Sequence, residues 1–145
     1  MSADMPPPPG GYTPPPPPPS GGSAQVRPGV VTAASVLLVI GGALAVLIGI
    51  LLLGGAGRVA GTGVGGVFAV IAVIELGVGA LQIYSGVQVL KLREVGRKIG
   101  VVMAGISAFF LLISIGRTPA GNVIGLAIDA FIIWALVTNA SLFTA

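Results

Sequence analysis

Two carboxylates stand inside long apolar stretches of this chain, and they are the side chains that most need a chemical explanation. Glu75 lies in the apolar run 67–90 and Asp129 in the run 121–142. A charged carboxylate at the centre of a bilayer costs about 2.5 to 3.5 kcal/mol, and desolvation disfavours its charged form. Neither run contains a lysine or an arginine, so neither acid has an ion-pair partner on its own helix.

Three interpretations of these acids remain open. In the first, Glu75 and Asp129 face one another as a reversible site for a proton or another cation, and Gln82 and Asn122 complete the polar shell. In the second, a protonated or hydrogen-bonded acid joins neighbouring helices, at about 0.6 to 2 kcal/mol per bond. In the third, an acid pairs with a basic residue of a partner membrane protein.

The inventory of reactive side chains is otherwise small. The chain has no cysteine and no histidine, so it cannot form a Cys/His metal site or a Ser-His or Cys-His nucleophile. Its only acids are Asp4, Glu75, Glu94 and Asp129. The sequence therefore predicts a protein that is not an enzyme, with no catalytic residue, no metal and no cofactor.

The composition is that of a chain solvated by lipid. Hydrophobic residues make up 54% of the 145 residues and charged residues only 8%, whereas soluble domains carry about 25% charged residues. The net charge of +3 does not indicate nucleic-acid binding, because the few basic residues lie at the ends of apolar segments. Membrane topology explains that placement.

The apolar runs divide the chain into two parts. Residues 1–27 form a Pro/Gly-rich tail, predicted to be disordered and cytoplasmic, because polyproline donates no backbone hydrogen bonds and buries nothing. Residues 28–145 are predicted to be an all-α transmembrane domain, a four-helix bundle with up-down-up-down topology. The expected helices span about 30–53, 67–90, 99–115 and 121–142, and the glycine-rich stretch 54–66 is expected to be a flexible loop.

Small residues recur at a spacing that favours close helix packing. Ser35, Gly42 and Gly49 are seven residues apart in the first run, and Gly100 and Ser107 are seven apart in the third. This spacing places small side chains on one stripe, where a neighbouring helix can approach. The other small residues expected at helix contacts are Gly79, Gly86 and Gly125.

One face of the second run combines polar and small residues. Glu75, Gly79, Gln82 and Gly86 follow at steps of four, three and four, which places them on one side of a helix. That side is expected to face protein and not lipid.

The basic residues predict the orientation. Lys91, Arg93, Arg97 and Lys98 lie in one short segment, which is expected to be a turn. The positive-inside rule places this segment in the cytoplasm. With four spans, both termini are then cytoplasmic, in a multi-pass protein of the bacterial plasma membrane.

Two short motifs resemble those of a known class of proteins. The entry to the first run reads Arg27-Pro28-Gly29-Val30-Val31-Thr32-Ala33-Ala34, and the exit from the second contains Tyr84, Gly86, Leu90, Lys91 and Arg93. The chain thereby resembles uncharacterised small four-helix membrane proteins of actinobacteria with a Pro/Gly-rich cytoplasmic tail. The resemblance implies a cellular setting but no mechanism.

Two functions are compatible with these features. The first is a non-enzymatic scaffold or accessory subunit, which contacts the lipid bilayer and either a membrane-protein partner or further copies of itself through helix faces. The alternative is a small proton- or cation-conducting oligomer or transporter that uses Glu75 and Asp129.

Overall fold

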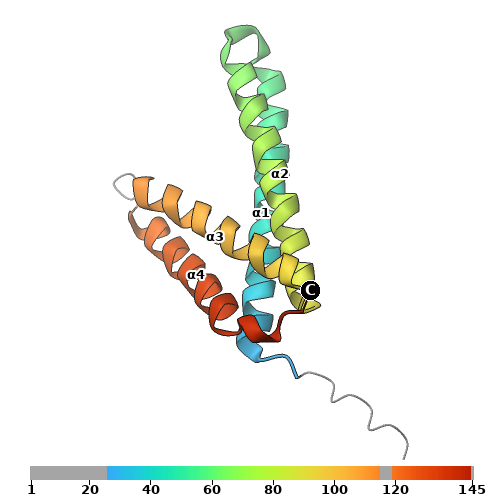
Figure 1. Ribbon diagram of the computed structural model, residues 1–145. Coiled ribbons are helices and arrows are strands. Elements are labelled where there is room, and N and C mark those ends of the chain that lie inside the picture. Colours follow the sequence, from blue (N-terminus) through green and yellow to red (C-terminus); the bar gives the residue numbers. More distant parts are fainter. Residues whose placement is uncertain (1–25, 115–118, 145) are drawn as a thin grey trace, which may run out of the picture.

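The computed structural model describes residues 26–114 and 119–144, and it confirms the predicted fold of four membrane-length helices (Figure 1). The Pro-rich tail lies outside the described residues. The elements are α1 (Gly29–Arg58), η1 (Ala60–Thr62), α2 (Val64–Leu90), α3 (Glu94–Ser114), α4 (Pro119–Thr138) and η2 (Ala140–Leu142).

The four long helices are apolar enough to cross a membrane by length and composition. In hydrocarbon a backbone has no water to bond with, so a spanning segment must satisfy its own N–H and C=O groups, as a helix does. Many large apolar side chains point outward, among them Leu51 at 66% exposure and Val73 at 63%. These outer faces are suited to contact with lipid.

Small residues line the contact between α1 and α2, which we term the α1–α2 seam. The residues recur every seven positions along both helices, in one antiparallel register, and all of them are buried. Close approach lets the Ser35 hydroxyl donate a hydrogen bond of 2.6 Å to the Gly86 carbonyl. The facing pairs are Ser35 with Gly86, Gly42 with Gly79, Gly49 with Ala72, and Ala56 with Gly65.

The glycine-rich stretch 54–66, expected to be a loop, is mostly helical. Helix α1 continues to Arg58, and α2 already begins at Val64. The chain reverses between them, where Gly63 takes a φ of 74°. A glycine costs a helix about 1 kcal/mol, but an unpaired backbone group in a bilayer costs several. The α1–α2 seam also extends into this stretch through Ala56 and Gly65.

The basic segment 91–98, expected to be one turn, is divided between a turn and a helix. The turn is confined to residues 91–93, and α3 begins at Glu94, five residues earlier than expected. Glu94 forms ion pairs with Arg97 (3.3 Å) and Lys98 (3.0 Å) on the next turn of the helix. An acid in the first turn with basic partners three and four residues later favours helix.

The helices form two hairpins that meet at one end and diverge from it (Figure 1). At the meeting point Ser85 of α2 donates a hydrogen bond of 2.8 Å to the carbonyl of Gly96 in α3. A Cβ on Gly100 would contact side chains of Ser85, Leu38 and Leu136. Helices α1, α2 and α4 therefore converge on one glycine of α3.

The C-terminal segment forms hydrogen bonds with the α2–α3 turn, at the end of the molecule where the two hairpins meet. Helix α4 ends at Thr138, earlier than the expected residue 142, and the chain turns back through η2. Thr144 then donates to the carbonyl of Leu92 and accepts from the N–H of Glu94, each at 3.0 Å. Because Arg27 also bonds to the Leu90 carbonyl, the start of α1, the α2–α3 turn and the C-terminal segment lie together.

Candidate functional site

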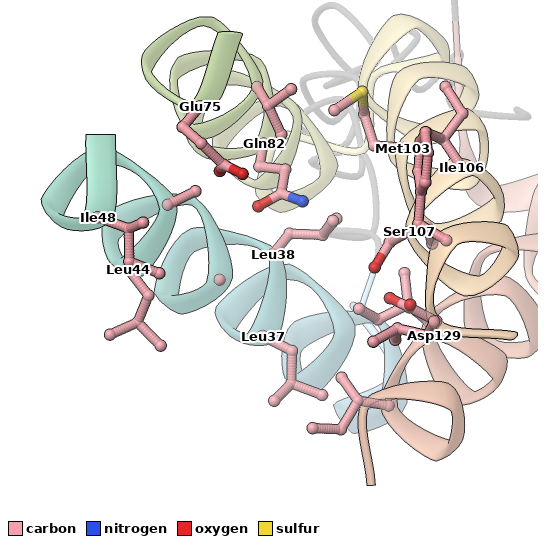
Figure 2. A pocket seen from close by; sticks show the side chains of 18 of the residues that line it. Leu37, Leu38, Leu44, Ile48, Glu75, Gln82, Met103, Ile106, Ser107 and Asp129 are labelled. Atoms are coloured by element: carbon pink, nitrogen blue, oxygen red, sulfur yellow. The ribbon is translucent and has the colours of Figure 1, made fainter. Parts of the chain in front are cut away.

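A cavity of about 600 Å³ lies between the two hairpins and is lined by all four long helices (Figure 2). We call it the inter-hairpin cavity. Most of its wall is aliphatic, and Phe110 adds an aromatic ring. Its polar lining consists of Glu75 and Gln82 from α2, Ser107 and Ser114 from α3, and Asp129 from α4.

The structure brings three of the four predicted polar-site residues to this cavity. Glu75 and Gln82 point into it from α2, and Asp129 lies on the opposite side (Figure 2). Gly79 and Gly86, expected on the same face as Glu75 and Gln82, pack against α1. One side of α2 therefore serves two contacts, with its glycines in the α1–α2 seam and its polar side chains in the cavity.

Asn122, the fourth predicted residue, belongs to the α3–α4 contact. Its side-chain nitrogen donates to the Leu111 carbonyl (3.3 Å) and to the Ser114 hydroxyl (3.2 Å). Asn122 precedes Asp129 by seven residues, as Ser107 precedes Ser114. Asn122 and Asp129 of α4 therefore lie opposite Ser114 and Ser107 of α3 across the hairpin.

Ser107, expected only as a packing residue, is the direct neighbour of Asp129. Its hydroxyl points toward the carboxyl group of Asp129 (Figure 2). The signal that could have found this pair is the matching spacing of seven in the third and fourth apolar runs. The sequence contains the spacing in each run, but not the register between the runs.

Two buried acceptors at the cavity lack a hydrogen bond within the described part of the chain. They are Oδ2 of Asp129, a residue only 8% exposed, and Oε1 of Gln82. An unpaired buried polar group costs about 1 to 3 kcal/mol. No lysine or arginine of residues 26–114 or 119–144 lines the cavity. The arrangement thus offers two carboxyl groups and unpaired oxygens inside an apolar wall, which suits a positive or hydrogen-bond-donating group.

Five other residues singled out in the sequence lie at helix contacts, in a turn or near a helix end, and not at the cavity. Gly125 packs against Leu111, where a Cβ would lie 2.7 Å from a methyl carbon. Lys91 and Arg93 lie in the α2–α3 turn, whereas Arg97 and Lys98 lie on α3. None of these five residues lines the inter-hairpin cavity.

The comparison with known families gives one match. Residues 30–141 match the family described as a domain of unknown function, DUF7144. The chain belongs to the DUF7144 family. The match covers nearly all of the four long helices, so the helices around the cavity are the DUF7144 domain. No curated protein and no solved structure matches the chain.

Membership of DUF7144 confirms the expectation of an uncharacterised family. The family description carries no activity.

Proposed function

We propose that this DUF7144 chain is a non-enzymatic integral protein of the bacterial, and specifically actinobacterial, plasma membrane, and that it acts as a scaffold or accessory subunit through its helix faces. The observation that carries the proposal is the projection of α1 and α2 beyond α3 and α4 (Figure 1). In this part the outer face of α2 is exposed, with Val70 at 62% and Val73 at 63%.

The outer face of α2 also has room for a close partner. A Cβ on Gly77 would meet no described atom within 4 Å. Helices in bilayers associate through tight packing, which small residues permit. A partner helix could therefore approach α2 at Gly77 more closely than at the surrounding valines and leucines.

Affinity isolation of the full-length chain from native membranes in a mild detergent tests this role. We expect a membrane-protein partner in stoichiometric amount, identified by mass spectrometry. Gly77→Leu should reduce its recovery at least tenfold, because a leucine there holds a partner helix away. Gly105→Leu is the matched control, since a Cβ on that glycine of α3 also meets no described atom within 4 Å.

Two results would contradict the scaffold proposal. One is isolation of the chain alone or only with copies of itself. The other is equal loss of the partner in the Gly77 and Gly105 variants, which would show that the outer face of α2 has no special part in the contact.

A second candidate function is conduction or transport of protons or other cations, and the observation that favours it is that Glu75 and Asp129 line one cavity. A hydrophobic carbodiimide should then label either acid, and proteoliposomes should show a flux that Glu75→Gln and Asp129→Asn both abolish. Wild-type proteoliposomes without flux under a proton or sodium gradient would exclude this candidate.

The orientation proposed here places both termini in the cytoplasm. Arg27, Lys91, Arg93, Arg97 and Lys98 gather at the end of the molecule that holds the α2–α3 turn, and positive charge favours the cytoplasmic side. Single cysteines can test this, because the chain has none. In intact cells a membrane-impermeant maleimide should label Gly61→Cys in η1 but not Lys91→Cys. The reverse labelling would show the opposite orientation.

A further inference from the structure

We propose that the inter-hairpin cavity binds a hydrophobic organic cation, that is, an apolar molecule of ligand size that carries one positive charge. The inference goes beyond a scaffold role, since it assigns a small-molecule site to the helix surfaces between the hairpins. It stands whether or not a partner protein covers the outer face of α2.

The size and wall of the cavity fit such a molecule. Ligand pockets in proteins usually measure about 300 to 1,000 Å³ and are mostly apolar, with a few convergent polar groups. The inter-hairpin cavity has about 600 Å³. Side chains such as Leu38, Leu44 and Phe110 surround it and can cover the apolar body of a ligand.

The charge of the wall selects the sign of the ligand. Glu75 and Asp129 approach the cavity from opposite sides (Figure 2), and the described lining contains no basic side chain. The buried oxygens Asp129 Oδ2 and Gln82 Oε1 have no hydrogen-bond partner among the described residues. A positive group beside them would compensate acceptors that otherwise remain unpaired in a low-dielectric surrounding.

Other occupants fit these oxygens less well. An acyl chain of a lipid fills apolar space but offers neither charge nor a donor. A second copy of this chain brings no basic residue from mid-membrane within residues 26–114 and 119–144, because each lysine and arginine described there lies near a helix end or in a connection. A small metal cation prefers a cage of several oxygens, whereas most of this wall is aliphatic.

Gly41 offers a way to block the cavity without changing its charge. Gly41 lies on α1 in the cavity wall. A Cβ added to it would have Gln82 Oε1 as its nearest neighbour, at 3.4 Å. That distance is an ordinary van der Waals contact, so a Cβ at this position fits without moving the backbone. A leucine there would occupy the space that a ligand needs.

Equilibrium binding of radiolabelled tetraphenylphosphonium to the purified full-length chain in lipid nanodiscs tests the proposal. We expect saturable binding of one ion per cavity. Asp129→Asn and Glu75→Gln should each weaken the affinity at least tenfold, because an amide keeps the shape of the acid but cannot take a negative charge beside a bound cation. Gly41→Leu should abolish binding, whereas Gly105→Leu and Glu94→Gln, which change residues outside the cavity wall, should leave it unchanged.

Three results would overturn the proposal. The first is the absence of saturable binding by the wild-type chain. The second is equally tight binding of neutral triphenylphosphine oxide, which would show an apolar pocket without charge selection. The third is full affinity in both Glu75→Gln and Gly41→Leu. Glu75 is only partly buried, so these two variants keep the test decisive if Asp129→Asn does not fold.

Discussion

Gly79→Leu is expected to separate α1 from α2 and to lower the free energy of unfolding by about 3 kcal/mol or more, at the upper end of what overpacking usually costs. A Cβ at this position would lie 2.6 Å from the Gly42 carbonyl oxygen and 2.8 Å from the Val46 backbone nitrogen. Backbone atoms cannot rotate away, so the helices must move apart. This movement also breaks the bond between Ser35 and Gly86.

Thermal denaturation of the detergent-solubilised chain, followed by size-exclusion chromatography, measures this effect. Gly77→Leu is the matched control, two residues away on the same helix, where an added Cβ meets no described atom within 4 Å. We expect a change below about 0.5 kcal/mol for it, as for most surface substitutions. Equal losses in the two variants would refute the tight α1–α2 seam.

Gly96→Leu is expected to release the α3–α4 hairpin from α2. A Cβ on Gly96 would lie 2.5 Å from the Gln88 Cβ and 2.6 Å from the Val89 backbone nitrogen. The substitution therefore pushes the start of α3 away from the end of α2 and breaks the bond from Ser85 to the Gly96 carbonyl. We expect a loss of about 3 kcal/mol, again from overpacking against backbone.

The separation of the hairpins gives a direct measurement of this effect. Because the chain has no native cysteine, spin labels can be attached at Leu51→Cys in α1 and Ile113→Cys in α3, which are both exposed. Electron–electron distance measurements should show a longer and broader distribution in Gly96→Leu. With Gly105→Leu the distribution should stay as in the parent chain, and a shift of the same size there would contradict the role of Gly96.

The sequence by itself determined that this is an all-α membrane protein with four spans. Hydropathy and composition are sums over residues, and a chain so poor in charge has only lipid to solvate its surface. Local periodicity also predicted small residues at helix contacts, and the α1–α2 seam contains Ser35, Gly42 and Gly49. Each of these features can be read from the sequence of a single helix, without knowing which helix packs beside it.

Helix boundaries depended on more than local pattern. Gly54, Gly55 and Gly57 are poor helix formers, yet α1 includes them, because a bilayer penalises unpaired backbone and Ala56 meets Gly65 of α2. Glu94 starts α3 inside the basic segment, because it pairs with Arg97 and Lys98.

Only the tertiary structure decided which polar residues meet. Periodicity places Asp129 and Asn122 on one face of α4, but it contains no information on what lies opposite. Because of the register of α3 against α4, Ser107 lies next to Asp129 and Ser114 lies next to Asn122. The contact of Gly96 with the end of α2 fixes where the two hairpins join. The inter-hairpin cavity, with Glu75 and Asp129 in its wall, arises from these non-local contacts, which no single apolar run specifies.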